Sequence, residues 1–188
     1  AERGQGLKLP VRLKVPGRHN VMNALAALAA ARALGLDLAQ AAKALEGFAG
    51  IKRRFEIVGT ASGITVIDDF AHNPDKITAT LRTLKMCGAR VIAIFQPHGF
   101  SPTRMMKDGL IDVFTRELAA QDILAMPEIY YAGGTADKSI SSKDIVDAVS
   151  ASGREAHFFD SRAAIIDFVA KTARSGDRVV VMGARDDT

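Results

Sequence analysis

The sequence Gly63-Ile64-Thr65-Val66-Ile67-Asp68-Asp69-Phe70-Ala71-His72-Asn73-Pro74 carries the clearest structural signal in the chain. Its apolar run is typical of a short buried strand, and Pro74 suits the first turn of a helix that we expect over Asp75–Met86. Carboxylates at the end of a strand, beside a helix start, lie where open α/β sheets bind ligands. A carboxylate there can accept two hydrogen bonds from a ribose diol. The plainer alternative is that Asp68 or Asp69 caps the helix and that His72 is a surface residue.

Strand-like and helix-like segments alternate along the rest of the chain. Strands are expected at Phe55–Val58, Ile64–Asp68, Arg90–Phe95, Ile123–Met126, Ala156–Phe159 and Arg178–Met182. Helices are expected at Asp75–Met86, Met106–Ala120, Ser142–Ser152 and Ser161–Ala173. The alternation predicts a Rossmann-like α/β fold, a mostly parallel sheet with helices on both faces. Because right-handed crossovers bring the carboxyl ends of parallel strands to one edge, the polar residues that follow the strands should gather there.

The first fifty residues have a different pattern. Leu7, Leu9, Val11, Leu13 and Val15 alternate with polar residues or proline, which predicts a half-buried strand. A helix is expected over Asn20–Leu34 with Asn20 as its N-cap, and because it is apolar nearly all round we expect it to be buried. A second helix is expected over Leu38–Leu45, followed by a hinge at Phe48–Ile51. One strand and two helices cannot close a core, so we interpret this part as the end of a larger domain.

Composition narrows the functional class. The chain has 188 residues, 48% of them hydrophobic and 24% charged, as in ordinary globular proteins. No apolar run reaches the roughly 18 residues that a membrane span needs, no signal peptide is recognisable, and the single cysteine, Cys87, fits a reducing cytoplasm. The net charge of +4 is scattered apart from Lys52-Arg53-Arg54, and only 6% of residues are aromatic. We therefore expect a cytoplasmic protein that binds neither nucleic acid nor membrane.

Several well-known motifs are absent. Gly133–Ser139 resembles a P-loop but has Asp137 where the motif needs glycine before the lysine. No cluster has the spacing of a zinc site, so no metal ligand is expected, and no nucleophile elbow identifies a catalytic residue. Spacing alone predicts a nucleotide-handling α/β domain and no more.

Five short segments in order along the chain add a family resemblance. They are Gly17–Ala27 (GRHNVMNALAA), Lys52–Glu56 (KRRFE), Asp68–Pro74 (DDFAHNP), Phe95–His98 (FQPH) and Val181–Ala184 (VMGA). They resemble the HNxxNALAA segment, the R-x-E hinge, the DDYxHHP and FQPH motifs and the MGAG ending of the Mur ligases. These enzymes form amide bonds at the expense of ATP during synthesis of cell-wall precursors.

The resemblance implies a domain plan. Residues 1–50 would be the end of the central ATP-binding domain, and residues 51–188 the C-terminal domain that closes over ATP and the amino acid. The P-loop, most ligands of Mg²⁺ and the UDP-sugar site would lie in parts of a Mur ligase outside this sequence. ATP and Mg²⁺ are the implied cofactors, and the isolated chain is expected to be inactive.

The resemblance also implies roles for individual residues. The residues expected at ATP are His19, Asn20, Asn23, Arg54, Asp69, Phe70 and His72. Among these, the asparagines match adenine-side positions, Asp69 the ribose-binding carboxylate, and Arg54 an arginine that meets ribose and phosphate. His98 and Arg104 match positions that hold the incoming amino acid. Helix capping for the asparagines, a solvated charge for Arg54 and a structural role for His98 remain alternatives.

The substrates are expected to be UDP-N-acetylmuramate, or a UDP-muramyl relative, and an amino acid or peptide. Phe95–His98 and the Gly183-Ala184 ending favour the branch that adds L-alanine through an acyl phosphate. Residues 99–104 read GFSPTR where that branch has RYTRTR, and Asn73 replaces a second histidine. The sequence of Asp68–Pro74 is more similar to that of the murein-recycling ligase, which attaches an intact tripeptide. A non-catalytic nucleotide-binding module and a related folate or polyamide synthetase are further alternatives, and the oligomeric state stays open.

Overall fold

The structure is a computed structural model that describes residues 8–183. The chain divides into two compact units, residues 1–51 and residues 52–188, and each is described here by itself. Leu7 and the residues after Gly183, on which part of the strand prediction and of the MGAG resemblance depends, lie outside the described residues.

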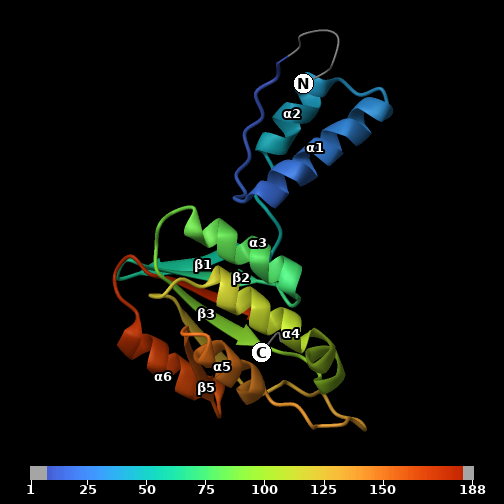
Figure 1. The fold of residues 1–188 in the computed structure, drawn as a ribbon. Coiled ribbons are helices and arrows are strands. Elements are labelled where there is room, and N and C mark those ends of the chain that lie inside the picture. The colour runs from blue at the N-terminus through green and yellow to red at the C-terminus, as the bar shows by residue number, and fades with distance from the viewer. Residues whose placement is uncertain (1–7, 184–188) are drawn as a thin grey trace. The chain divides into compact units, whose positions relative to one another are not determined.

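The second unit is built on one six-stranded sheet with the strand order β1-β2-β6-β3-β4-β5 (Figure 1). The strands are β1 (Glu56–Ala61), β2 (Ile64–Asp69), β3 (Val91–Gln96), β4 (Ile123–Pro127), β5 (Glu155–Phe159) and β6 (Arg178–Gly183). Only the edge strand β1 runs antiparallel, and every other pairing among these strands is parallel. The prediction of a mostly parallel α/β sheet is therefore confirmed.

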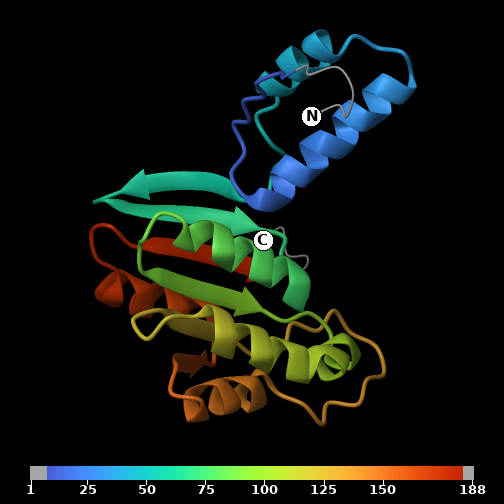
Figure 2. The same ribbon diagram turned by 45° about the horizontal axis from the view of Figure 1, so that its top comes forward.

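Helices cover both faces of this sheet, as predicted. They are α3 (Pro74–Lys85), α4 (Phe100–Glu117), α5 (Ser142–Ala151) and α6 (Arg162–Thr172). The first three pack on one face and build the larger core, with fully buried side chains such as Ile77, Phe114 and Ile145. Helix α6 covers part of the opposite face through Phe168 and Val169, as the turned view makes clear (Figure 2).

The strand register places the carboxyl ends of the parallel strands side by side. Asp69 pairs with Met182, and Gln96 pairs with Gly183 across the parallel ladders. Pro127, at the end of β4, pairs with Phe159 at the end of β5. Because these strands run in the same direction, their last residues form one continuous edge, where open α/β sheets bind ligands.

Local chemistry explains where the helix after β2 begins. Asn73 is the N-cap of α3, and its side-chain oxygen accepts a hydrogen bond from the Lys76 amide at 3.0 Å. Pro74 follows as the first helical residue, where a missing N–H costs nothing. The alternative in which Asp68 or Asp69 caps this helix is therefore wrong.

Helix α4 begins six residues earlier than predicted, at Phe100 instead of Met106. Gly99 is its N-cap with φ of 78°, a left-handed conformation that favours glycine. Pro102 then falls in the first turn, where helical N–H groups have no acceptor, so the proline does not interrupt the helix.

The first unit contains α1 (Arg18–Ala33) and α2 (Leu38–Glu46), which pack against each other. The predicted strand over residues 7–15 is wrong for the described residues 8–15, which pair with no other strand. Burial does alternate between Val11 and Val15, as the pattern indicated. A strand also needs a partner for its backbone groups, however, and the described part of this unit contains no second strand.

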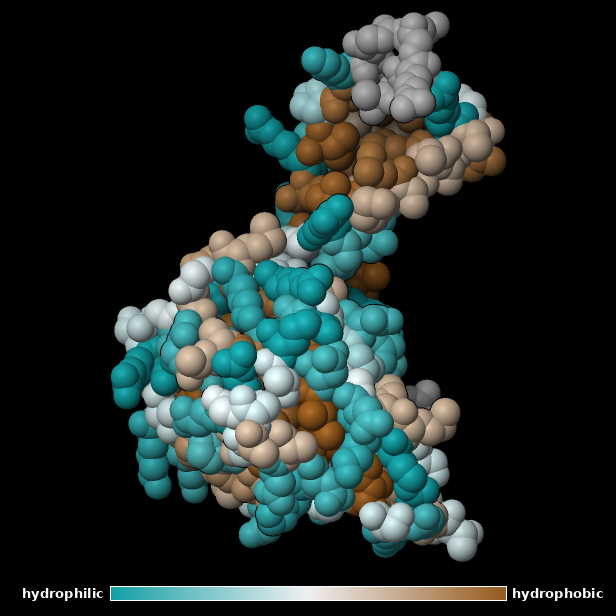
Figure 3. All heavy atoms as spheres, in the orientation of Figure 1, coloured by the Kyte–Doolittle hydropathy of each residue, from teal (hydrophilic) through white to brown (hydrophobic). Residues whose placement is uncertain are grey.

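Helix α1 also differs from expectation. It was predicted to be buried, yet Val21, Met22, Leu25 and Leu34 are between 50% and 77% exposed. Apolar side chains accordingly appear in brown on the surface of this unit (Figure 3). Only Ala24 of this helix is buried, and α2 is the one helix that packs against it within the described part of the unit.

The N-terminus of α1 lies two residues before the predicted one. Gly17 is the N-cap with φ of 99°, and Asn20 lies inside the first turn. The Asn20 side-chain amide instead donates to the Pro16 carbonyl at 2.6 Å. Asn20 therefore ties the first turn of the helix to the residue before the N-cap. The prediction that Asn20 is itself the N-cap is wrong.

Among residues 8–183, no helix is long and apolar enough to cross a membrane.

Candidate functional site

Three cations surround one aromatic ring at the carboxyl end of β2. The guanidinium carbons of Arg53 and Arg54 lie 5.4 and 5.5 Å from the centroid of the Phe70 ring, and the Lys76 ammonium lies 5.8 Å from it. The Phe70 amide donates to the Arg53 carbonyl at 2.7 Å, which ties the segment before β1 to the end of β2. We call Arg53, Arg54, Phe70, His72 and Lys76 the Phe70 cluster.

His72 completes this cluster as a neutral base. Its ring meets Phe70 edge-on with the centroids 4.8 Å apart, and its Nδ1 lies 3.1 Å from the Phe70 carbonyl. Because a carbonyl can only accept, Nδ1 carries the proton and Nε2 presents a lone pair. Burial lowers the pKa of His72 below its usual value, and the charges of Lys76 and Arg54 lower that pKa further. The imidazole is therefore neutral at pH 7.

The charges of the cluster are only partly compensated. Arg53 Nε forms an ion pair with Asp68 at 3.3 Å, and the Arg53 amide donates to Glu56 at 2.7 Å. Arg53 also adopts φ of 59°, an uncommon conformation for a non-glycine residue. Arg54 and Lys76 have no carboxylate within salt-bridge distance among the described residues. The cluster thus carries a net positive field, which suits an anionic ligand.

Asp69, the residue predicted to bind ribose, lies at the base of this region. It is 9% exposed and accepts a hydrogen bond from the Thr80 hydroxyl at 2.5 Å. Thr80 is on α3, so Asp69 faces the side of the sheet that α3, α4 and α5 cover. The carboxylate is held by the protein on this side, and its role toward a nucleotide stays a prediction.

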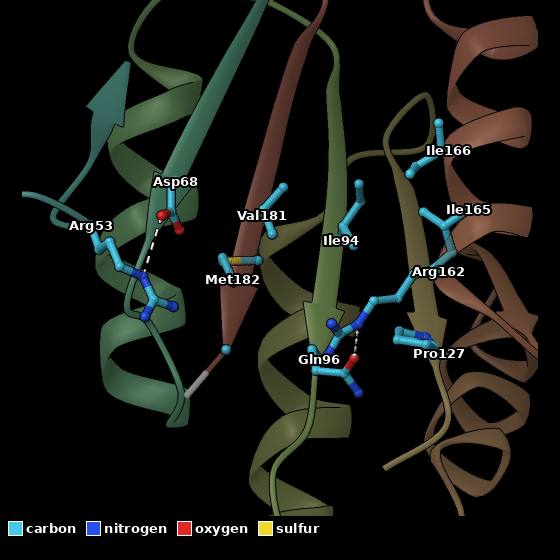
Figure 4. A pocket seen from close by; sticks show the side chains of 11 residues that line it. Arg53, Asp68, Ile94, Gln96, Pro127, Arg162, Ile165, Ile166, Val181 and Met182 are labelled. Carbon is cyan, nitrogen blue, oxygen red and sulfur yellow. Dashed lines mark hydrogen bonds and ion pairs between the residues drawn. The ribbon is translucent and has the colours of Figure 1, made fainter. Parts of the chain in front are cut away.

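A pocket of about 250 Å³ opens on the other face of the same edge, beside α6. Figure 4 shows the Arg53–Asp68 pair on one side and Arg162, bonded to Gln96, on the other. Apolar side chains lie between these two polar pairs. The pocket is lined by Arg53, Asp68, Ile94, Gln96, Pro127, Arg162, Ile165, Ile166, Val181, Met182 and Gly183. Arg53 belongs both to this pocket and to the Phe70 cluster.

His98 and Arg104, which were predicted to bind the amino acid, lie beyond the end of β3. His98 contacts the segment after β4, and Arg104 is on α4. The His98 ring stacks on Tyr130 with centroids 5.4 Å apart. Arg104 pairs with Asp137 at 2.9 Å and also donates to Ser139 at 3.1 Å. The Arg104 charge is therefore compensated by the loop before α5. Their binding of an amino acid stays a prediction.

The predicted ATP-binding residues of the first unit lie at the start of α1. His19 and Asn23 are exposed, and the Asn23 side chain donates to the Asn20 side-chain oxygen at 3.5 Å. These residues belong to a different unit from the Phe70 cluster.

Sequence reasoning assigned no place in the site to two polar residues of this edge, Lys76 and Arg162. Lys76 lies four residues after His72, but His72 precedes the N-cap of α3, so no helical spacing in the sequence linked the two side chains. Asp68 was considered together with Asp69, and Gln96 was recognised within the FQPH segment, but neither was assigned to this pocket. Arg162 reaches the pocket only because the crossover through α6 returns to the middle of the sheet.

Residues 8–183 contain no group of three or more histidine, cysteine, aspartate or glutamate side chains that could hold a metal ion.

Known proteins resemble this chain over most of its length. A family model described as "Mur ligase, glutamate ligase domain" matches residues 53–185. The UDP-N-acetylmuramate–L-alanine ligase of Pelotomaculum thermopropionicum is 39% identical over 176 residues, which cover 93% of this chain and 37% of that protein. The ligase of the same name from Agathobacter rectalis is 41% identical over 175 residues, with the same two coverages.

Solved structures agree with these matches. The UDP-N-acetylmuramate–alanine ligase from Thermotoga maritima superposes with a TM-score of 0.76 at 33% identity, covering 95% of this chain and 37% of that one. A murein peptide ligase from Psychrobacter arcticus superposes with a TM-score of 0.61, also at 33% identity, covering 92% and 35%. The chain thus spans a little over a third of the length of these relatives.

Proposed function

Because the chain belongs to the Mur ligase family, through a glutamate ligase domain over residues 53–185, we propose that it forms the closing part of an ATP-dependent amide ligase. The ligase would act in peptidoglycan precursor synthesis and join the carboxylate of UDP-N-acetylmuramate to L-alanine. The observation that carries the proposal is the Phe70 cluster, an aromatic ring surrounded by cations at the ligand-binding edge of the sheet.

The reaction proceeds through an acyl phosphate. The γ-phosphoryl group of ATP moves to a carboxylate oxygen of the UDP-muramyl substrate, and ADP is left. The uncharged amine of the amino acid attacks the acyl carbon, the bond from that carbon to the phosphate oxygen breaks, and a proton leaves the new amide nitrogen. Inorganic phosphate is released. The chain's own contribution is to position the reactants and to neutralise phosphate charge, which are large terms in such transfers.

Individual side chains would divide this work. Phe70 offers a flat surface for the adenine, and Arg54 a cation for ribose and phosphate oxygens. Asp69 would meet the ribose from its buried position, and His72 lies beside both groups. The family resemblance assigns Asn20 and Asn23, with His19 beside them, to the adenine side of the nucleotide. We assign the Mg²⁺ ligands mainly to the central ATP-binding domain that the family resemblance implies.

The acceptor would be held on the other side of β3 by His98 and Arg104. Residues 99–104 carry one arginine, whereas the corresponding segment of the alanine-adding branch carries three. A second candidate is therefore the attachment of an intact L-alanyl-γ-D-glutamyl-diaminopimelate tripeptide. It is favoured by the sequence of Asp68–Pro74.

Calorimetric titration of the chain with ADP tests the nucleotide part of this proposal. Arg54→Gln should weaken ADP binding about tenfold, since a charge-assisted hydrogen bond contributes about 1.5–3 kcal/mol. Lys52→Gln, an exposed neighbour in the same basic run, is the control and should bind like the wild type. Equal losses in the two variants would show that Arg54 acts only through the overall charge. No binding of ADP by the wild-type chain would contradict the nucleotide assignment.

A further inference from the structure

We propose that Lys76 is a second phosphate-binding cation of the nucleotide site and that His72 positions its ammonium group. The inference rests on the function proposed above and adds a residue to which neither sequence motif nor family resemblance gives a role. It is carried by the geometry of the Phe70 cluster and by the charges that surround it.

Lys76 and Arg54 approach the same aromatic ring from different elements. Lys76 is the third residue of α3, whereas Arg54 belongs to the segment before β1. Their cationic groups lie 5.8 and 5.5 Å from the Phe70 centroid. Both side chains therefore place a positive charge next to the surface on which we expect the base to stack, at the distance of a cation–π contact.

The charge balance at this point favours an anion. Arg53 is paired with Asp68, but Arg54 and Lys76 have no carboxylate partner within reach among residues 8–183. Two like charges that share a site raise the free energy of the empty protein, and a phosphate group would relieve that repulsion. The first turn of α3 adds the positive end of its helix dipole at the same place.

His72 supplies the contact that holds Lys76 in position. The Lys76 ammonium lies 3.5 Å from His72 Nε2, the nitrogen with the lone pair. The opposite nitrogen is fixed by its hydrogen bond to the Phe70 carbonyl, so the imidazole cannot turn away without breaking that bond. A neutral acceptor orients the lysine but leaves its charge in place, whereas a carboxylate would neutralise it. Protonation of His72 is opposed by Lys76 and Arg54, which both lower its pKa after the larger effect of burial.

The competing explanation is that Lys76 is a surface lysine whose aliphatic stem merely covers Phe70. The two explanations differ in what the side chain does for the phosphates as opposed to the base. A stem that only packs should affect adenosine and ADP alike, but a phosphate-binding cation should affect ADP alone.

The experiment compares ADP, tripolyphosphate and adenosine as probes by calorimetry with the 188-residue chain. Lys76→Gln should weaken binding of ADP and of tripolyphosphate about tenfold and leave adenosine unchanged. Lys76→Arg, which keeps the charge, should recover most of the loss. Lys85→Gln, the same change at the other end of α3, is the matched control and should have less than a twofold effect.

The role of His72 is tested by a double-mutant cycle, which measures coupling between two side chains. His72→Ala should weaken ADP binding severalfold in the wild-type background and have little further effect once Lys76 is glutamine. Independent, multiplying effects of the two changes would show that His72 does not act through Lys76.

The outcomes separate this inference from the proposed function. ADP binding that is lost equally in Lys76→Gln and Lys85→Gln overturns the role of Lys76 but leaves the nucleotide site. An equal loss of adenosine binding in Lys76→Gln would likewise contradict a phosphate contact. If the wild-type chain binds neither ADP nor tripolyphosphate, the inference fails together with the proposed nucleotide site.

Discussion

Asp68 and Asp69 are adjacent in the sequence but serve opposite faces of β2. Successive side chains of a strand point to opposite sides of a sheet. Asp69 consequently faces α3 and bonds to Thr80, while Asp68 faces the α6 side, where it pairs with Arg53 and lines the pocket. The alternation itself follows from the sequence, but which face is covered by three helices depends on crossovers that no local pattern reveals.

Removal of the Thr80 hydroxyl should destabilise the second unit. Thr80→Val keeps the shape of the side chain but withdraws a hydrogen bond from the Asp69 carboxylate, which stays buried. An under-satisfied buried polar group costs about 1–3 kcal/mol, so the free energy of unfolding in urea should fall by about that amount.

Thr78→Val, on the same helix but away from Asp69, is the control for the loss of a hydroxyl. A loss of stability in Thr80→Val no larger than that of the control would mean that this hydrogen bond contributes nothing to the fold.

At the scale of elements, the sequence predicts best where its signals are local. Strands β3 and β4 were found because their apolar runs are buried, and α3 because Pro74 begins it. The predicted start of α4 was six residues late, because Gly99 and Pro102 fit a helix N-cap and first turn as well as they fit a loop. The predicted strand over residues 7–15 failed because strand formation needs a partner, and pairing is not a local property.

In the candidate site, too, the sequence predicted the residues of a contiguous motif but not those that come from distant elements. Residues that follow one another after β2, such as Phe70 and His72, were recognised from a contiguous motif. Arg162 could not be recognised, because it comes from a different element, 66 positions after its partner Gln96. Only the return of the chain through α6 to the middle of the sheet brings the two together.

Asn73 replaces the second histidine of the family motif, and the structure gives this residue a role as the N-cap of α3. It caps α3 through the Lys76 amide and so fixes the first turn below the Phe70 cluster. Asn73→Ala should lower the free energy of unfolding by about 1 kcal/mol, as loss of an N-cap does, with denaturant unfolding as the measurement.

Asn73→Asp is the matched variant, because it keeps the capping oxygen and adds a charge that the helix dipole favours. It should retain wild-type stability. If the alanine and aspartate variants were equally unstable, capping would not be the role of this residue.

At the scale of the whole molecule, ion pairs join elements that lie far apart in the sequence. Arg90, just before β3, binds Asp177, just before β6, with its Nη2 2.5 Å from the carboxylate. Hydrogen bonds from Arg90 lower the pKa of Asp177, burial opposes this effect, and the Arg174 amide lowers the pKa further. The pair fastens the amino ends of two central strands.

This pair predicts an acid-sensitive fold. The folded-state pKa of Asp177 is below its ordinary value of 3.8, so its contribution to stability is complete above that pH. The contribution is lost as the pH falls through the lower, folded-state pKa. The urea midpoint should therefore decline steeply below about pH 4.

Asp177→Asn should be less stable at neutral pH and should flatten that decline. Asp147→Asn, which breaks only an exposed ion pair with Lys143, is the control and should keep the wild-type profile. A profile of Asp177→Asn parallel to that of the wild type would exclude this linkage.

We propose that this chain serves as the ATP-closing and acceptor-binding part of a Mur ligase. The most direct test replaces the aligned 176 residues of the Pelotomaculum thermopropionicum ligase with this chain and follows ADP formation from ATP, Mg²⁺ and UDP-N-acetylmuramate. L-Alanine, other amino acids and the L-alanyl-γ-D-glutamyl-diaminopimelate tripeptide are offered as acceptors. We predict turnover that depends on L-alanine. Turnover with the tripeptide alone would transfer the proposal to the second candidate, and a well-folded chimera that turns over no acceptor would contradict it.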